Sequence, residues 1–412
     1  MLRAERRGER FAERVLCKPA KGIDCPGPDP LALPLGRIAR VLSQQQVPRA
    51  VEGVLRDYFD ATATALDEIS PVVTQVGDAL AEFVLGGGKR IRPLFVHAGW
   101  RCALSAGPPD ERPDPARTEP LMLRTGAAIE LIQACALVHD DILDRSDTRR
   151  GNPTVHRRFE RLHDDLAWSG EAAHHGVSVA ILLGDLALAW ADDLVHGYAP
   201  AGASPATGPA GMPLPAAAGT LWSRMRTEVL GGQLLDITNE VSGDESVDAA
   251  YRVMEYKTAA YTVARPLEIG AALGEAPREL SESLRRIGTG LGLAFQLRDD
   301  VLGAFGDPAQ TGKPSGDDLV SGKRTVLVTE ALASSVPAVA ADLRGFLGRS
   351  LSDDELSEAR EILTGSGALA EVEAQVDGHL TVALDEIDAL PVDAAARDDL
   401  RALARRIAHR HT

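Results

Sequence analysis

The amino-acid sequence predicts an all-α protein in the form of a single large helical bundle. Apolar residues recur with helical spacing from about residue 47 to the C-terminus, and no break in this pattern marks a domain boundary. Aromatic residues make up only 4% of the 412 residues and alanine is abundant, which favours packed helices over sheets. Segments such as 126–138 and 177–191 are apolar nearly all round, which is typical of helices that other helices enclose.

The individual helices can be placed in order along the chain from the hydrophobic period and from Gly and Pro residues. Gly86 to Gly88 end the second helix, and Pro93 begins the third. The expected helices are 47–66, 71–87, 93–105, 120–144, 176–197, 219–241, 247–273, 279–304, 322–334, 338–349, 353–365, 367–389 and 393–410.

Three segments fall outside this helical pattern. Residues 1–35 mix Arg and Glu with Pro and Gly, which predicts a disordered N-terminal extension before a helical domain over 36–412. Two biased segments inside that domain, about 105–120 and 199–219, predict surface loops.

The composition argues against several classes of protein. A formal net charge of −16 argues against a nucleic-acid-binding surface. The four cysteines have no CxxC or metal-site spacing, which fits a reducing, cytoplasmic location. The longest apolar run, 177–195, is interrupted by acidic residues, so we expect no integral membrane segment.

The most informative segment runs from Val138 to Asp144, because a helix there gathers three aspartates. Residues i and i+4 lie one above the other on a helix face, so Asp140 and Asp144 are expected to direct their carboxylates to one point, with Asp141 beside them. Such like charge next to an apolar run is unfavourable unless a cation neutralises it. Hard oxygen ligands suit Mg²⁺, which keeps several waters and shares its remaining positions with substrate phosphates.

A second acidic pair, Asp299-Asp300, follows another apolar helical run, 291–297. Each acidic segment is therefore expected near the C-terminal end of a central helix. Two such segments that face each other across a cavity would hold a diphosphate through metal ions. One segment alone would indicate only a solvated helix end.

Basic residues supply the complementary charge. In the segment 86–93, GGGKRIRP, a glycine-rich corner lets the backbone approach an anion, with Lys89 and Arg92 beside it. Arg149 and Arg150, expected about a quarter turn apart on a helix, would each serve a different phosphate group. Further cations close to helix ends are Lys257, Lys313 and Lys323.

The order of these motifs resembles that of the trans-isoprenyl diphosphate synthases, the polyprenyl synthetase family. The matching series over roughly residues 50–335 is GGGKRIRP at 86–93, DDILD at 140–144 with Arg149-Arg150, GQLLD at 232–236, YKT at 256–258, FQLRDD at 295–300, and the TGKP and GKRT lysines. The resemblance implies an isoprenoid-synthase-type bundle around a central cavity and a homodimer. It also implies a head-to-tail condensation of isopentenyl diphosphate with an allylic diphosphate (dimethylallyl, geranyl or farnesyl), with three Mg²⁺ ions as cofactor.

The resemblance further implies roles for individual residues. The metal ligands would be Asp140, Asp144 and Asp299, supported by Asp141 and Asp300. The residues that hold the allylic diphosphate would be Arg149, Lys257 and Lys313. The residues that hold isopentenyl diphosphate would be Lys89, Arg92, Gln133 and Arg150, with Lys323 as a further substrate-binding cation. Thr258 and Gln296 would line the reacting centre, Gln233 and Asp236 would anchor its polar roof, and His139 is expected to pack or orient the motif rather than act as a base.

One position departs from the family pattern. Gly303 stands where the second acidic motif usually has a third aspartate, so no carboxylate reinforces the metal from that position. We expect activity to survive, because Asp299 remains and because Asp307 or the pair Asp317-Asp318 would compensate through water.

The length of the product is expected to depend on the residues about one turn before Asp140. Cys135 and Ala136 are small, where short-chain members carry a bulky aromatic residue, so a C15 product should not be the stopping point. Residues expected to close the channel after a further isoprene unit are Ile132, Leu131, Ala128, Leu182 and Leu183. The expected product is geranylgeranyl diphosphate (C20), and a longer polyprenyl diphosphate is the alternative.

Two other classes remain open from the sequence. A class I terpene cyclase also uses an aspartate-rich helix, but it would have no task for the 86–93 corner or for Gln133, and no NDxxSxxxE-type motif is present. A non-catalytic subunit of a heteromeric synthase has Gly303 as its only support, since the first aspartates and the arginine pair remain.

Overall fold

The structure is a computed structural model that describes residues 41–108, 110, 112–198, 211–306 and 316–408. The predicted extension over 1–35, residues 199–210 of a predicted loop, and Lys313 and Asp307 lie outside the described residues. The division of the chain into domains that the sequence suggests therefore stays a prediction.

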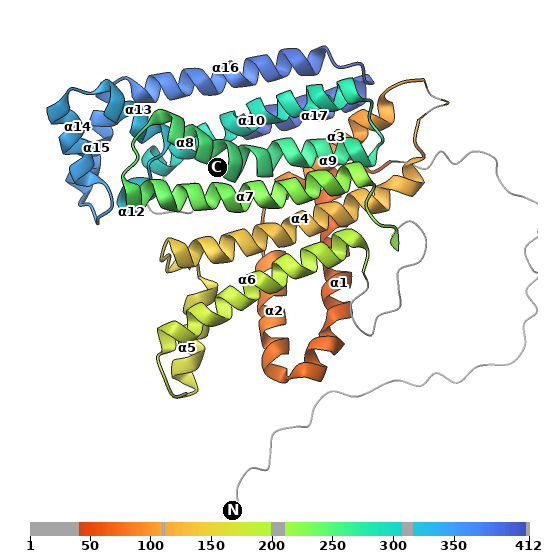
Figure 1. Ribbon diagram of the computed structural model, residues 1–412, viewed down its shortest axis with the longest axis horizontal. Helices are drawn as coiled ribbons and strands as arrows, with labels where there is room; N and C mark the ends of the chain where they lie inside the picture. Colours follow the sequence, from red (N-terminus) through yellow and green to blue (C-terminus); the bar gives the residue numbers. More distant parts are fainter. Residues whose placement is uncertain (1–40, 109, 111, 199–210, 307–315, 409–412) are drawn as a thin grey trace, which may run out of the picture. The chain divides into compact units, whose positions relative to one another are not determined.

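The predicted all-α class is confirmed, because the described residues form helices apart from one small antiparallel hairpin (Figure 1). The longer helices are α1 (Val47–Ile69), α2 (Pro71–Leu85), α3 (Ile91–Ser105), α4 (Pro115–Leu143), α5 (Val155–Asp165), α6 (Ala172–His196), α7 (Ala216–Ser242), α10 (Arg278–Phe305), α16 (Ala368–Asp388) and α17 (Ala394–Ala408). The shorter elements are η1 (Gln44–Gln46), β1 (Thr148–Arg149), β2 (Asn152–Pro153), α8 (Val247–Val253), the π-helix η3 (Met254–Ala264), α9 (Arg265–Leu273), α12 (Asp317–Ser321), α13 (Val326–Ser334), α14 (Pro337–Phe346) and α15 (Asp353–Gly365).

Helix α5 was not predicted from the sequence. Its buried residues Val155 and Phe159 are one turn apart, with Leu162 on the same face, so the segment has the apolar stripe of a short amphipathic helix. Its high content of Arg, His and Asp obscures this stripe in the sequence.

Two predicted helix boundaries are also wrong. Helix α4 begins at Pro115 rather than near 120, because the Asp114 side chain accepts a hydrogen bond from the Ala116 N–H (3.0 Å) and caps the first turn. The helix predicted from residue 322 begins only at Val326, as α13, because Gly322 adopts a φ of 78° and ends the preceding short helix α12, and Thr325 caps the first turn of α13.

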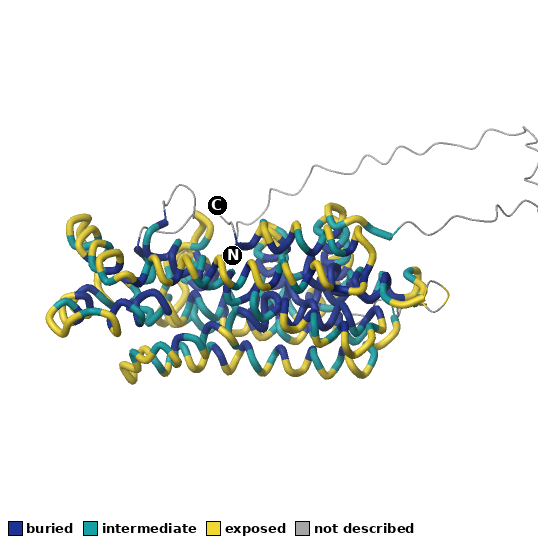
Figure 2. Tube along the Cα trace, turned by 90° about the horizontal axis from the view of Figure 1, so that it is seen from above, coloured by how far each residue is buried: buried dark blue, intermediate teal, exposed yellow. Residues whose placement is uncertain are grey.

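Helices α4 and α10 organise the core of the bundle. Helix α4 packs against α6, α3 and α1, and α6 runs along its length (Figure 1). Helix α10 supplies Leu284 and Leu291 to the larger hydrophobic cluster and Leu297 and Val301 to a second one beneath α13 and α16. Figure 2 shows the buried segments gathered inside the bundle and the exposed ones on its outer faces. The acidic ends of α4 and α10 are thereby fixed to the core.

In the described ranges one helix, α4, is long and apolar enough to cross a membrane by length and composition. It is buried over 78% of its most apolar window, as expected for the central helix of a bundle.

Candidate active site

The last turn of α4 carries the first acidic segment. Asp140 and Asp141 lie in that turn, and Asp144 is the C-cap residue, whose N–H donates to the Asp140 carbonyl oxygen (2.8 Å). The carboxylates of Asp140 and Asp144 each contact a different lysine: Lys257 Nζ is 3.5 Å from Asp140 Oδ1, and Lys323 Nζ is 2.8 Å from Asp144 Oδ2. The acidic segment is therefore neutralised by cations from two other parts of the chain.

Asp140 also meets groups from α7 and from the hairpin. Gln233 Nε2 donates to Asp140 Oδ1 at 3.2 Å, and Arg149 Nη2 lies 3.6 Å from Oδ2. Burial alone would raise the pKa of Asp140, but the charges of Lys257, Lys323 and Arg149 together hold that pKa below its ordinary value. Asp140 is consequently an anion at neutral pH.

The adjacent arginines lie on a β-hairpin, so the prediction that a helix carries them is wrong. Arg150 and Gly151 form the two-residue turn between β1 and β2, with φ values of 53° and 77°. This turn separates the two side chains. Arg149 Nε donates to Asp141 Oδ1 at 2.7 Å, whereas Arg150 Nη1 donates to the Gly87 carbonyl oxygen at 3.1 Å. One arginine serves the acidic segment and the other the glycine-rich corner.

Lys257 lies in the π-helix η3, which interrupts the helix predicted over 247–273. Short π-helical stretches often occur at functional sites, because the wider turn redirects side chains. A Cβ at Gly232 of α7 would overlap the backbone of Lys257, so the glycine allows the two helices to approach closely. This approach places Lys257 Nζ 2.6 Å from Asp236 Oδ2, one turn further along α7.

The second acidic pair, near the end of α10, serves partly to join helices. Asp300 is buried, and its carboxylate accepts hydrogen bonds from Gln296 Nε2 (2.7 Å) and from the Val326 N–H (3.3 Å) at the start of α13. Burial, together with the nearby charges of Asp318 and Asp299, raises the pKa of Asp300 well above its ordinary value. Gln296, expected to line the reacting centre, thus directs its amide to Asp300.

Lys323 links the two acidic segments. Burial would lower the pKa of Lys323, but the carboxylates of Asp144, Asp318 and Asp140 raise it above its ordinary value. Asp318 is also the carboxylate that most strongly raises the pKa of Asp300. Lys323 therefore contacts the acidic end of α4, and Asp318 on α12 lies close enough to both Lys323 and Asp300 to raise their pKa values.

The unusual Gly303 has a steric explanation. In the buried helix α10, the space that a Cβ at position 303 would need is taken by the carboxylate of Asp318 from α12. An aspartate at 303 would fit only if Asp318 moved. Among the described residues expected to compensate, Asp318 therefore places its carboxylate at this position.

Arg90, which was not predicted from the sequence to belong to the site, anchors the glycine-rich corner. Its buried guanidinium donates to Glu130 Oε2 on α4 and to the Val84 carbonyl oxygen, both at 2.6 Å. Gly87 and Gly88 have φ values of 144° and 127°, which residues with a Cβ rarely adopt. The sequence does not indicate that Arg90 is buried, because an arginine between Lys89 and Arg92 could equally be exposed to solvent.

The residues expected to hold isopentenyl diphosphate lie on both sides of this corner. Lys89 is exposed on it, and Arg150 reaches it from the hairpin. Arg92, in the first turn of α3, donates to Thr262 Oγ1 (2.9 Å) and lies over the Tyr261 ring, 4.4 Å from its centroid.

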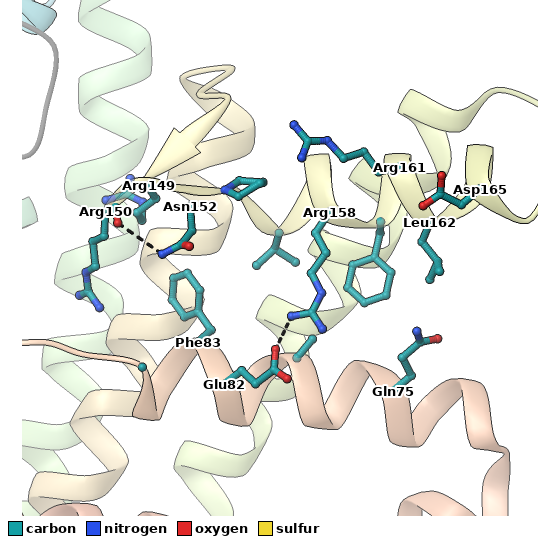
Figure 3. Close-up of a pocket in the computed structure, with 15 residues that line it drawn as sticks. Gln75, Glu82, Phe83, Arg149, Arg150, Asn152, Arg158, Arg161, Leu162 and Asp165 are labelled. Atoms are coloured by element: carbon teal, nitrogen blue, oxygen red, sulfur yellow. Dashed lines mark hydrogen bonds and ion pairs between the residues drawn. The ribbon is translucent and has the colours of Figure 1, made fainter.

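An arginine-rimmed groove lies beside the corner, between α2, the hairpin and α5 (Figure 3). Arg158 on α5 donates to Glu82 Oε2 on α2 at 2.5 Å, which ties the two helices together across the groove. In Figure 3 the side chain of Arg150 turns away from Arg158, towards the glycine-rich corner. The groove therefore adds positive charge near the corner.

An apolar cavity of about 160 Å³ opens beside Asp140. Its lining includes residues expected to contact substrate or set product length: Ile132, Gln133, Cys135, Ala136, Lys257, Thr258 and Arg92. Helix α6 contributes Leu188 to this lining rather than Leu182, whose side chain is exposed, or Leu183, which is buried in the core. His139 packs against Gly184 of α6, where a Cβ would overlap its ring.

The donor set fits a hard divalent cation. Within the part of the chain that the structure describes, no three His, Cys, Asp or Glu side chains group as a metal site, and lysines stand between the carboxylates instead. Asp141 Oδ2 is buried without a hydrogen-bond partner among the described residues, and burial raises the pKa of Asp141 to about 6 against the opposing charge of Arg149. These carboxylate oxygens already pair with lysine and arginine side chains, and one oxygen of Asp141 has no hydrogen-bond partner among the described residues. Such oxygen ligands suit Mg²⁺.

Comparison with known proteins identifies the same family as the motifs. Residues 73–363 match the family model described as polyprenyl synthetase. A geranylfarnesyl diphosphate synthase from Aeropyrum pernix is 31% identical over 82% of this chain and 95% of its own. A (2E,6E)-farnesyl diphosphate synthase from Mycobacterium bovis is 33% identical over 78% of this chain and 80% of its own. The crystal structure of a geranylgeranyl pyrophosphate synthase from Corynebacterium glutamicum, in complex with isoprenyl diphosphate and magnesium, is 41% identical, with a TM-score of 0.80 over 90% of this chain and 100% of that one.

Proposed function

Because the chain belongs to the polyprenyl synthetase family, we propose that it condenses isopentenyl diphosphate head-to-tail with an allylic diphosphate to give geranylgeranyl diphosphate. The family makes it a prenyltransferase of isoprenoid biosynthesis, and prenyl diphosphate synthases are Mg²⁺-dependent enzymes that use these two kinds of substrate. The C20 product, the roles of the residues and the oligomeric state are the parts that we infer.

One arrangement carries the proposal: Lys257, Lys323 and Arg149 each contact a carboxylate of the acidic segment at the end of α4, and Asp140 of this segment lines an apolar cavity. An incoming diphosphate offers these cations a more highly charged partner. Asp140 and Asp144 would then need another cation, and together with Asp299 they would hold Mg²⁺, in three ions according to the family pattern. When bound, Mg²⁺ supplies positive charge that neutralises the departing diphosphate.

The chemistry requires little of the protein beyond charge, orientation and exclusion of water. The allylic C–O bond breaks, the double bond of isopentenyl diphosphate forms a C–C bond to the freed carbon, and the released diphosphate takes the proton lost from the new product. Arg149, Lys257 and Lys313 would hold the leaving group. The apolar cavity keeps water away from the carbocation. No protein nucleophile is needed.

The second substrate is expected to lie between the glycine-rich corner and the cavity beside Asp140. Lys89 and Arg150 meet at the glycine-rich corner, and Arg92 and Gln133 border the cavity. These four groups would bind the diphosphate of isopentenyl diphosphate. A terpene cyclase would leave this set without a task, which favours the synthase over the cyclase.

A C20 product is supported by the small cavity wall next to Asp140. Cys135 and Ala136 line the cavity there without a bulky ring, so a C15 chain would meet no obstacle at these two residues. The related proteins named above are synthases of farnesyl, geranylgeranyl and geranylfarnesyl diphosphates, so a longer product remains the alternative.

A homodimer is supported by exposed apolar side chains on the outer faces of α6 and α7. Leu182 on α6 and Leu234 on α7 are 66% and 64% exposed, with Ile181 beside Leu182. A second copy that covers these faces would remove this apolar surface from water. Light scattering of the purified protein should give twice the mass of one chain. The cytoplasmic location stays a prediction, consistent with the free thiols of Cys102 and Cys135.

The proposal is tested by incubating the purified protein with dimethylallyl diphosphate, labelled isopentenyl diphosphate and Mg²⁺. Labelled geranylgeranyl diphosphate is the expected product. A hydrocarbon product would indicate a terpene cyclase. No labelled product without an added partner would indicate a non-catalytic subunit, and either result would overturn the proposal.

A further inference from the structure

The cavity beside Asp140 is bordered by an ion pair at the end away from the acidic segment. Arg226 of α7 lines the cavity, and its Nη1 lies 2.7 Å from Asp192 Oδ1 on α6. The same oxygen accepts a hydrogen bond from Trp222 Nε1 at 2.8 Å. The guanidinium also lies over the Trp222 ring, 5.7 Å from its centroid. Arg226 is thus held by an ion pair and by a cation–π contact, and the ion pair connects α7 to α6.

The order of residues along α7 shows where the Arg226–Asp192 ion pair lies relative to Asp140. Gln233 donates to Asp140, Leu230 lines the cavity almost one turn before it, and Arg226 lies a further turn away. Seven residues separate Gln233 from Arg226, and an α-helix rises about 1.5 Å per residue. Arg226 therefore lies ~11 Å along the helix axis from Gln233, which donates to Asp140.

Helix α6 gives the same order from the other side of the cavity. Gly184 packs against His139, the neighbour of Asp140. One turn further, Leu188 lines the cavity, and one turn beyond that Asp192 holds Arg226. Along both α6 and α7, the residues that border the cavity therefore change in the same order: close to the Asp140 segment, then apolar, then charged.

We propose that Arg226, held by Asp192 and Trp222, is the floor of the elongation cavity and determines the length of the product. This inference rests on the proposed synthase function. A prenyl chain that grows beyond this point has to separate Arg226 from Asp192 and place hydrocarbon against both charges, which is unfavourable. Until that point the chain lies along apolar residues such as Cys135, Leu188 and Leu230 and gains by burial.

A charged floor is tolerated here because its outer side reaches solvent. The side chains of Arg226 and Asp192 keep 28% and 39% of their surface exposed. The aliphatic part of Arg226 can therefore face the cavity while its charge stays hydrated and paired. This floor differs from the one expected from the sequence, which consists of Ile132, Leu131 and Ala128 with Leu182 and Leu183 of a neighbouring helix.

The test compares Arg226→Ala with the wild-type protein, using dimethylallyl diphosphate, excess labelled isopentenyl diphosphate and Mg²⁺, and separating the products by chain length. We expect the share of products longer than the main wild-type product to rise at least tenfold. Asp192→Ala, which frees Arg226, should shift the distribution in the same direction. Arg224→Ala is the matched control, because Arg224 lies on the same helix but is exposed and pairs with Glu228 outside the cavity.

The distribution of lengths is a ratio among chains made by folded enzyme, so partial loss of folded protein does not change it. An unchanged or shorter distribution from Arg226→Ala, with normal elongation by the wild type, would overturn the floor assignment and leave the synthase function intact. An equal lengthening from Arg224→Ala would also overturn it. Absence of elongation by the wild type would overturn the proposed function, and the floor with it.

Discussion

The carboxylate of Asp318 on α12 occupies the space beside Gly303 on α10, so a side chain at 303 and the present position of Asp318 exclude each other. The residue types at positions 303 and 318 are therefore coupled. An acidic group is kept near Asp300 and Lys323, but it comes from a different helix than the family pattern suggests.

Substituting Gly303→Ala should therefore destabilise the protein, although alanine usually favours a helix. The new methyl group would collide with Asp318, at a cost of about 1–3 kcal/mol. Thermal unfolding should show a lower Tm, and the double variant with Asp318→Ala should recover most of the loss attributable to the collision. Gly290→Ala on the same helix, which meets only an ordinary contact, should be neutral or stabilising. Equal Tm values for Gly303→Ala and Gly290→Ala would contradict this account.

Asp140→Ala should abolish turnover without unfolding the protein. Lys257 would still pair with Asp236, and Arg149 with Asp141, so few charges would lose their partners. We expect kcat to fall roughly 10²–10³-fold or more, as when a group that stabilises developing charge is removed. Steady-state kinetics with a thermal unfolding curve measures both effects.

Asp185→Ala is the control for this substitution. Asp185 is an acid near His139 whose side chain is 60% exposed, so its loss should change neither turnover nor Tm appreciably. Retained turnover in Asp140→Ala would remove Asp140 from the set of metal ligands.

Glu130→Ala should weaken both the fold and the binding of isopentenyl diphosphate. It leaves the buried guanidinium of Arg90 without its closest carboxylate, and breaking such a pair typically costs about 3–5 kcal/mol. Because Arg90 fixes the corner that carries Lys89, the KM for isopentenyl diphosphate should rise more than that for the allylic substrate. Glu52→Ala, which removes the longer and more exposed contact to Arg90 (3.6 Å), should cost only about 0–1 kcal/mol. A KM that changes equally for both substrates would count against the role of the corner.

Cys135→Phe should shorten the product. The ring would enter the cavity next to Ala136 and take the space that a growing chain needs. The product distribution should move to C15 or shorter, whereas Cys135→Ala, which adds no volume, should leave it unchanged. If the phenylalanine variant makes the wild-type product, the chain does not pass this part of α4.

The fold class could be predicted from the sequence because long, strongly periodic segments leave little choice. The glycine-rich corner and the acidic segments could also be placed, since Gly86 to Gly88 and the aspartate runs are local signals. The hairpin at Arg149 and Arg150 could not be predicted, because it depends on positive φ at Arg150, which ordinary propensities do not indicate.

Other features depend on contacts between distant segments and therefore leave no local signal. The buried Arg90 pairs with Glu130, which lies 40 residues away in the sequence and beside it in the fold. The overlap of Gly303 with Asp318 and the pairing of Arg226 with Asp192 belong to the same class. The close approach of Gly232 to the π-helix at Lys257 is likewise a contact between distant segments.

The most direct test is a crystal structure with Mg²⁺ and an unreactive thio-analogue of the allylic diphosphate. We expect ions bound between Asp140 and Asp144 on one side and Asp299 on the other, with Lys257 Nζ moved from Asp140 to a phosphate oxygen. Asp140 and Asp299 pointing away from each other, with no ion between them and the analogue bound elsewhere, would contradict the central claim.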